Sequence, residues 1–380
     1  MPRSSHSLIK AAVFVQALAV MLPACAKAPP QHLLERIELP PGYRISVYAE
    51  VPGARQLAVG DALGVVFVGT RNDTVYAVED RDRDHVGETV TEFRDDLNGP
   101  SGVAFADGYL YVSERHRLTR YAAAELDIAR RDPQPEVIFR GFPDETHHGT
   151  RFTETGPDGA VYVALGVPCN ICEPPGNSDA ILRFAPRGND GFAAPAIYAA
   201  GIRNAVGMDF HAATGDLFFT DNGVDNLGDE RPPGEFNRAT SAGQHFGFPW
   251  YAGGEVRHPE WSDREPPTAT TAPVAEFRAH VAPLGMHFYQ GNMLPAAARG
   301  DAFVAQHGSW NRSTPIGYRV VRVDVAEDGS VAGQDVFADG WLAEDGNAWG
   351  RPVDVAELAD GSLLVSDDYQ GVIYRISYSP

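Results

Sequence analysis

Lysine is almost absent from this 380-residue sequence, and its two lysines, Lys10 and Lys27, both lie near the N-terminus. The cations of the remaining chain are arginines and histidines, which excludes chemistry through a lysine Schiff base. Positive charge is scarce as a whole, because 31 Lys and Arg stand against 51 Asp and Glu and give a formal net charge of -20. Binding to nucleic acid needs clustered basic side chains, so we expect no nucleic-acid partner.

The sequence also lacks heptads and long helical periodicity, whereas it contains 39 Gly and 29 Pro. This composition favours an all-β fold. Its apolar run at residues 11–22 is too short for a confident transmembrane helix and follows Arg3, His6 and Lys10, as in an export signal. We therefore expect residues 1–25 to be a signal peptide and residues 26–36 a tether.

The end of this leader resembles the processing site of a bacterial lipoprotein, in which Cys25 becomes the acylated first residue. Pro23 is unusual at such a site, so ordinary cleavage nearby is the alternative. Either reading predicts a periplasmic protein, and the first predicts a lipid anchor. Cys169 and Cys172 are then left as a pair in an oxidising compartment, where a disulfide is expected. A structural metal site would need further ligands, and no second cysteine pair exists.

A two-strand pattern recurs along the rest of the chain: a turn with Gly or Asp, an apolar strand, a polar loop, and a second strand ending near an aromatic residue or arginine. The copies lie at residues 60–69 with 74–78, 107–113 with 117–121, 158–164 with 180–184, 201–210 with 215–220, 301–305 with 318–323, and 360–366 with 371–376.

Six such copies at irregular spacing predict the blades of a six-bladed β-propeller, since neither fragment of a pair can bury both of its faces alone. A strand near residues 43–46 is placed to complete the last blade and close the ring. The alternative is a pair of β-sandwiches. Residues 255–273, rich in Pro, Glu and Thr, are expected to form a surface insertion, so that residues 37–380 make one domain.

Several predicted loops carry cationic or amide side chains just before or within a repeat. They contain His147, His148 and Arg151; Arg203 and Asn204; His307 and Arg312; and Arg351. In a propeller such loops converge on one end of the central channel. Arginines that meet there would repel one another unless an anion lay between them, and the guanidinium group binds carboxylates in a bidentate manner. The simpler alternative for each arginine is a salt bridge on the surface or between blades.

All of these residues except Arg351 lie in segments that resemble the sorbosone/glucose dehydrogenase family, whose members are soluble six-bladed propellers that use pyrroloquinoline quinone. The segments are residues 201–208, 221–223, 229–230, 235–237 and 243–249, together with His147-x-x-x-Arg151 ahead of residues 156–163 and the run at 306–313. The last two fit the sorbosone dehydrogenase-like branch. The similarity spans roughly residues 38–378.

The resemblance implies that His147 is the general base that removes a proton from a sugar hydroxyl. It implies that Arg203 and Asn204 contact the quinone, with Arg203 near the reactive oxygens, and that Arg151 and Arg351 belong to the cofactor site. The cofactor is a tricarboxylate, which agrees with the converging arginines. A histidine that titrates near neutral pH suits proton removal.

The resemblance also implies a calcium ion bound to the cofactor and to the main-chain carbonyls of Gly223 and Val224. Calcium prefers oxygen ligands and acts as a Lewis acid on a quinone carbonyl. The family has a lysine at the cofactor that has no counterpart here, and Arg312 or His307 is expected to replace it.

Three other positions depart from the glucose enzyme. Thr146 stands where that enzyme has the Asp that orients the base, so the partner of the His147 ring is open, and His148 is a second candidate for the base. Val224 replaces a proline, which a main-chain ligand tolerates. Val353 occupies the place of a second arginine near Arg351.

The sequence thus predicts a quinone- and calcium-dependent dehydrogenase that oxidises a sugar or sugar-derived aldehyde and passes electrons to a periplasmic acceptor. A second possibility is a calcium-dependent lactonase or esterase that holds the ion with Asn204, Asn222 and Asp354. A third is a propeller without activity that binds glycans or proteins. The arginine cluster favours the first over the second, because a bare calcium site needs carboxylates and amides.

Overall fold

The structure, a computed structural model, describes residues 31–128, 133–188 and 191–380, so the expected signal peptide, Cys25 and residues 26–30 lie outside it. Within the expected tether, α1 (Gln31–Leu34) is a short helix whose Leu34 is buried in the same apolar cluster as Trp341 and Tyr374. No helix among the described residues is both long and apolar enough to span a membrane.

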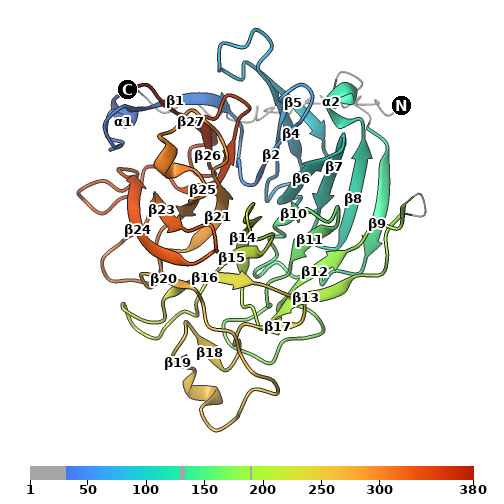
Figure 1. Ribbon diagram of the computed structural model, residues 1–380, viewed down its shortest axis with the longest axis vertical. Coiled ribbons are helices and arrows are strands. Elements are labelled where there is room, and N and C mark those ends of the chain that lie inside the picture. The colour runs from blue at the N-terminus through green and yellow to red at the C-terminus, as the bar shows by residue number, and fades with distance from the viewer. Residues whose placement is uncertain (1–30, 129–132, 189–190) are drawn as a thin grey trace, which may run out of the picture.

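Six antiparallel sheets of four strands, one with an added fifth strand, surround a common centre (Figure 1). The first blade consists of β2 (Leu57–Val59), β3 (Val66–Val68), β4 (Val75–Glu79) and β5 (Thr89–Arg94). The second consists of β6 (Gly102–Ala106), β7 (Tyr109–Ser113), β8 (Arg117–Ala122) and β9 (Pro135–Arg140), with α2 (Ala124–Asp127) between the last two. The third consists of β10 (Thr153–Thr155), β11 (Val161–Ala164), β12 (Ala180–Phe184), β13 (Ala196–Ala200) and the added strand β17 (Gln244–His245).

The fourth blade consists of β14 (Ala205–Phe210), β15 (Leu217–Asp221), β16 (Gly234–Ala239) and β20 (Ala275–Phe277). The fifth consists of β21 (Pro283–Phe288), β22 (Ala302–Gln306), β23 (Arg319–Val325) and β24 (Val331–Ala338), and contains the 3-10 turn η4 (Ala296–Ala298) before β22. The sixth consists of β25 (Pro352–Glu357), β26 (Leu363–Asp367), β27 (Val372–Tyr378) and, from the start of the chain, β1 (Tyr43–Glu50). The prediction of an all-β, six-bladed propeller is therefore confirmed.

The predicted closure of the ring is also confirmed, because β1 pairs antiparallel with β27 from Tyr43 opposite Tyr378 to Glu50 opposite Val372. Tyr48 of β1 is 1% exposed and packs with residues of the first blade, including Val66 and Val78. The first strand thus joins the last blade to the first. Such pairing of the two chain ends leaves the ring without an open gap between blades.

Apolar side chains on the middle strands of each blade form the core between neighbouring blades. All residues of β3, β11, β15 and β26 are buried, whereas outer strands such as β5 and β24 alternate or are mostly exposed. A strand buried on both faces reads as a continuous apolar run, which explains why the repeats were visible in the sequence. Residues 255–273 contribute no strand to any blade; they carry β19 (Val256–Arg257), paired with β18 (Tyr251–Ala252), and η3 (Pro259–Trp261), and project from the ring as the predicted insertion.

The innermost strands β2, β6, β10, β14, β21 and β25 contact one another in that order around the central channel, and β25 contacts β2. Val206, Leu284 and Val353 come from three of these strands and form a small buried cluster, which we call the channel plug. The plug separates an upper cavity, at the starts of the inner strands, from a lower cavity, toward their ends. The side chain of Val353 therefore packs in this apolar plug.

Candidate functional site

The upper cavity has a volume of about 350 Å³, within the range of small-molecule sites. Its polar lining comprises Arg71, His148, Arg203, Asn204, Asn222, Asp225, His280, His307, Asn311 and Arg351. Among the described residues, three arginines and one carboxylate, Asp225, therefore line the upper cavity. In a protein with a formal net charge of -20, this local excess of cations indicates an anionic ligand.

Arg203 is held in place by groups of the protein. Its guanidinium donates to the carbonyl of Asn170 (3.0 Å), to Asn170 Oδ1 (2.9 Å) and to the carbonyl of Asn222 (3.1 Å), and it pairs with Asp225 (3.2 Å). The backbone N–H groups of Arg203 and Asn204 both donate to the carboxylate of buried Asp221, at 2.8 and 2.6 Å. The predicted pair Arg203 and Asn204 is thus fixed at the cavity wall.

Asn170 lies in the turn closed by Cys169 and Cys172, whose predicted disulfide is confirmed. Besides accepting from Arg203, its amide accepts from the N–H of Asp225 (2.9 Å) and donates to the Asp225 carbonyl (3.1 Å). Sequence reasoning missed Asn170, although its place between the two cysteines was a usable signal. The disulfide turn therefore supports the cavity wall through the backbone carbonyl and the side-chain amide of Asn170.

The two adjacent histidines differ in their placement. His147 is exposed and lines a side cavity beside the upper one, together with Arg71, Arg115 and Thr146. His148 is partly buried, lines both cavities, and its Nδ1 lies 2.7 Å from the carbonyl of Val167. A carbonyl only accepts, so Nδ1 carries the proton and Nε2 carries the lone pair. The structure therefore gives His148 a fixed tautomer.

The surroundings of His148 keep its ring neutral. Burial, together with the charges of Arg203 and the neighbouring His147, lowers the pKa of His148 to about 3. His148 has a positive φ of 49°, and its Cβ lies where a Cβ on Gly166 would approach to 2.6 Å. Gly166 thus permits the close approach that brings His148 next to Asn204.

Arg351 also lies in the upper cavity, and its guanidinium pairs with Asp368 (3.0 Å) and lies over the ring of Tyr369. Asp368 is bound as well by Arg55 (2.5 Å) and by His307 (3.1 Å). Burial works against ionisation of Asp368, but these partners outweigh it and hold its pKa well below the usual range. Burial lowers the pKa of His307 to about 4, so this ring is neutral.

Two residues that the sequence predicts to bind the cofactor, Arg151 and Arg312, line neither the upper cavity nor the side cavity. Arg151 is 1% exposed and donates to the carbonyls of His148 (3.2 Å) and Pro143 (2.6 Å), so it braces the histidine turn. Arg312 binds the carbonyl of Asp229 and the carboxylate of Glu230 and is absent from the cavity linings. Both guanidinium groups are engaged by neighbouring loops. Arg71, which was not predicted from the sequence, lines both the upper cavity and the side cavity.

Gly223 lines the upper cavity, whereas Val224 is fully buried and packs with Val167 and Phe248. Calcium would be bound through backbone carbonyls here, so burial of the Val224 side chain is compatible with the prediction. The buried Asn204 Oδ1 and Arg351 Nε have no hydrogen-bond partner among the residues that the structure describes, which leaves an acceptor and a donor for a ligand. Polar groups of the cavity therefore fit an anionic quinone with a hard cation.

The residues of the lactonase alternative do not come together. Asn204 and Asn222 line the upper cavity, but Asp354 lies beyond the plug in the lower cavity. A propeller hydrolase with these three ligands around one calcium ion is therefore not supported by the geometry. The arginines stand where that reading would need carboxylates.

Comparisons with known proteins bear on the family and the fold. Residues 237–379 match the model of the TrAA12-like family. An uncharacterized protein of Borreliella burgdorferi is 30% identical over 361 residues, which are 92% of each chain. The chain belongs to the TrAA12-like family. The resemblance to quinone-dependent sugar dehydrogenases drawn from the sequence is thereby confirmed.

Solved structures share the fold of this TrAA12-like protein. The holo form of the pyranose dehydrogenase PQQ domain from Coprinopsis cinerea has 19% identity, covers 90% of this chain and 97% of that chain, and superposes with a TM-score of 0.72. A calcium structure of the Trichoderma reesei carbohydrate-active enzyme of family AA12 has 20% identity, the same two coverages and the same TM-score.

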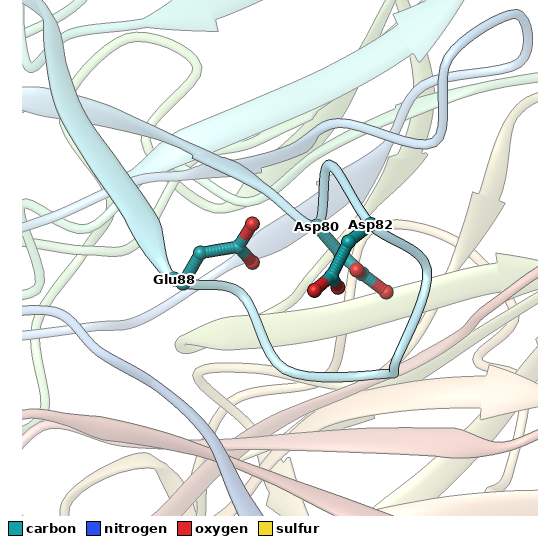
Figure 2. Close-up of side chains that lie close together, drawn as sticks. All are labelled: Asp80, Asp82 and Glu88. Carbon is teal, nitrogen blue, oxygen red and sulfur yellow. The ribbon is translucent and has the colours of Figure 1, made fainter.

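An acidic group of this TrAA12-like protein lies away from the channel. Asp80, Asp82 and Glu88 face one another on the exposed loop between β4 and β5 (Figure 2). Their carboxylates accept backbone N–H groups of the same loop: those of His85 (3.0 Å), Asp84 (3.2 Å) and Arg81 (3.2 Å), respectively. Hydrogen bonds that close the loop account for this arrangement.

Proposed function

We propose that this protein is a quinoprotein dehydrogenase that binds pyrroloquinoline quinone and calcium in the upper cavity and oxidises a sugar or a sugar-derived aldehyde. The observation that carries the proposal is the convergence of Arg71, Arg203 and Arg351 on one cavity of an acidic protein. A tricarboxylate suits three cations, and the pyranose dehydrogenase that shares the fold is described as a PQQ enzyme.

The residues of the chain bind and orient the reactants. Arg351, fixed by Asp368, and Arg71 would hold carboxylates of the cofactor, and Arg203 and Asn204 would contact the quinone ring. The carbonyls of Gly223 and Val224 would hold the calcium ion. When bound, the quinone supplies the two-electron acceptor and calcium polarises its carbonyl. Trp310, 76% exposed at the rim, offers an apolar face to a sugar ring.

We assign the general base to His148 in place of His147. Nε2 of His148 carries the lone pair, because Nδ1–H donates to Val167, and the ring lies in the same cavity as Arg203. This Nε2 would accept the proton of the sugar hydroxyl. Burial is the main cause of the low His148 pKa and the charge of Arg203 is the second, so an anion bound beside Arg203 would raise that pKa toward the working range.

We also propose a location for the protein in the cell. A signal peptide at residues 1–25 with acylation of Cys25 would place the protein in the periplasm on a lipid anchor, where it would pass electrons to a periplasmic acceptor. These assignments rest on the sequence of the leader.

Dye reduction tests the function directly. Protein freed of quinone and calcium is assayed with an aldose panel after addition of quinone, calcium, both or neither. We expect turnover with both additions together and little with either alone. Quinone binding that is unchanged by a chelator in the calcium-stripped protein would contradict the calcium assignment, and absence of turnover on every aldose and aldehyde would contradict the proposal.

A further inference from the structure

The proposed function assigns no ligand to the side cavity, which has a volume of about 330 Å³. This cavity shares Arg71, His148 and Asn204 with the upper cavity, so the two spaces meet at the proposed base. Arg115 lines the side cavity and not the upper one. No carboxylate lines the side cavity within the described residues, although the formal net charge of the protein is -20. A sugar whose hydroxyl faces His148 can therefore extend toward a further cation.

Arg115 is fixed in place at the wall of the side cavity. It follows β7, and its backbone N–H donates to the carbonyl of Asn98 (3.0 Å), while its Nε donates to Asn98 Oδ1 (3.0 Å). The carbons of its side chain lie between two glycines. A Cβ added to Gly99 would lie 3.3 Å from Arg115 Cγ, and one added to Gly149 would lie 3.2 Å from Arg115 Cδ. Hydrogen bonds and packing therefore set the position of the guanidinium group.

The guanidinium group of Arg115 retains capacity to bind a ligand. Nε and Nη2 both donate to Asn98 Oδ1, whereas Nη1 makes no hydrogen bond to any residue that the structure describes. Asp144 pairs with Arg115 at 3.4 Å, but the Asp144 side chain is 55% exposed, so water screens this pair. A cation that is partly compensated in this way suits an anion of single charge, such as a carboxylate, better than a phosphate dianion.

The other arginines near the proposed base are already matched to the cofactor. Arg71 donates through Nε to Thr150 Oγ1 (3.3 Å) and forms no ion pair within the described part of the chain. With Arg203 and Arg351 it makes up the three cations assigned to the tricarboxylate. Among the described arginines that line the two cavities, Arg115 is therefore the one without an assigned ligand, and an anionic group of the substrate would bind there.

We propose that the substrate is an acidic sugar, such as a hexuronate, whose carboxylate binds Arg115 in the side cavity while its anomeric hydroxyl faces His148. This inference rests on the proposed function and names its substrate class. The carboxylate and the anomeric carbon are the two ends of the carbon chain of a hexuronate. Gly149, which the Arg115 side chain contacts, directly follows His148, so one sugar can bridge the two side chains.

The oxidation leaves the carboxylate unchanged. The anomeric hydroxyl would give its proton to His148 Nε2, and the hydride of the same carbon would pass to the quinone of the proposed function. The carbon–oxygen double bond formed in this step makes the product a lactone. Arg115 would determine specificity and take no part in either transfer.

The test compares D-glucuronate with D-glucuronamide, which has the same hydroxyls and no charge. Dye reduction by the full-length protein loaded with quinone and calcium gives kcat/KM for each sugar. We expect the value for glucuronate to be higher by about tenfold or more, because a hydrogen bond between charged partners is stronger than one to a neutral group. Arg115→Gln should bring the two values together.

Arg120→Gln is the matched control. Arg120 lies on β8 of the same blade, pairs with Glu136 (2.8 Å) and lines neither cavity, so this variant removes the same charge and should keep the full preference. Binding is measured apart from turnover with methyl glucuronide, whose anomeric hydroxyl is blocked. Calorimetric titration should show that methyl glucuronide binds Arg115→Gln about tenfold more weakly than the wild type, and Arg120→Gln with unchanged affinity.

Equal kcat/KM values for the two sugars in the wild type, or a preference for glucuronate that persists in Arg115→Gln, would overturn the inference. A higher value for glucose 6-phosphate than for glucuronate would also overturn it, in favour of a phosphate. If Arg115→Gln fails to fold, Asp144→Asn decides the outcome, because it removes the opposing charge at an exposed position and should raise the preference for glucuronate.

The two proposals fail in different ways. Turnover of neutral aldoses without any preference for glucuronate would overturn the acidic-sugar site and leave the proposed function intact. Absence of turnover on every sugar, together with binding of methyl glucuronide that depends on Arg115, would contradict the proposed function and retain the acidic-sugar site.

Discussion

Two neighbouring histidines differ at the upper cavity because the chain turns between them. His148 has a positive φ and donates through Nδ1 to Val167, so its Nε2 is available beside Arg203, whereas the His147 ring is exposed and packs on it at a centroid distance of 4.0 Å. His147 is therefore a suitable control position, one residue away from the proposed base His148.

We expect His148→Ala to lower turnover by about 10²–10⁴-fold, the usual contribution of a general base, and to retain bound quinone. His147→Ala should keep turnover within a few-fold, as its ring lies only in the side cavity. Dye-reduction kinetics and quinone titration of both variants measure this. The opposite pattern, with turnover lost in His147→Ala alone, would restore His147 as the base.

The arginines divide into those that reach the cavity and those that brace loops. Arg351→Ala should weaken quinone binding, with turnover partly restored by excess quinone, because it removes one charge from the ligand site. Arg312→Ala should leave quinone affinity nearly unchanged, since that guanidinium binds Asp229 and Glu230. Quinone titration followed by fluorescence compares the two. A larger loss in Arg312→Ala would show that the loop opens toward the cofactor.

At the scale of elements, the disulfide turn acts on the site through Asn170. Asn170→Ala removes two hydrogen bonds to Arg203 and Asp225 made by its amide oxygen, and a bond donated by its nitrogen. We expect weaker quinone binding with the disulfide intact, because Arg203 loses one of the four interactions that orient it. Asn170→Asp is the matched comparison. It keeps an acceptor oxygen and should weaken quinone binding less than Asn170→Ala does.

The disulfide itself should be structural. Replacing both Cys169 and Cys172 by Ser should cost about 2 kcal/mol, because the loop is short, and should retain turnover at saturating quinone. Urea unfolding measures the loss of stability, and dye reduction measures turnover. Loss of turnover with unchanged quinone affinity and melting temperature would instead give the cysteines a redox role.

Strand β16 carries a buried carboxylate that links stability to pH. Burial, together with the charge of Asp221, raises the pKa of Glu235 from an ordinary 4.5 to about 8. The folded state holds a proton that the unfolded chain releases, so stability is full below about pH 4.5 and is lost as pH rises through about 8, at up to about 1.4 kcal/mol per unit.

Glu235→Gln should make this decline shallower between about pH 5 and 8, because the amide does not titrate. Glu92→Gln, at an exposed position of β5 in the first blade, should leave the decline in place. Urea unfolding across the pH series measures both variants. A wild-type protein whose stability is constant over this interval would contradict the assignment.

For the whole molecule, closure of the ring depends on β1. Tyr48→Ala should lower the free energy of unfolding by about 3–5 kcal/mol, because it opens a cavity where the sixth blade meets the first. Tyr48→Phe keeps the packing and should stay within about 1 kcal/mol of the wild type. Equilibrium unfolding measures the free energy of unfolding of both variants. Equal losses of this free energy in the two variants would show that the hydroxyl, not the ring, stabilises the closure.

Local patterns in the sequence were sufficient for the architecture. The middle strands of the blades are buried on both faces, so they appear as apolar runs between turns, and their number and the leading strand predicted the closed six-bladed ring. The cysteine spacing likewise sufficed for the disulfide. These features depend on each residue's own burial and on near neighbours in the chain.

Only the tertiary structure decided which polar side chains meet. Arg71 and Asp368 are far apart in the chain from Arg203, and no periodic pattern marks them. Arg151 and Arg312 carry the same charge as Arg351, but neighbouring carbonyls and Glu230 engage them before they reach the cavity. The choice between His147 and His148 follows from one positive φ and one long-range hydrogen bond. Direction and partner of a side chain are set by other blades, and so they are not written in the local sequence.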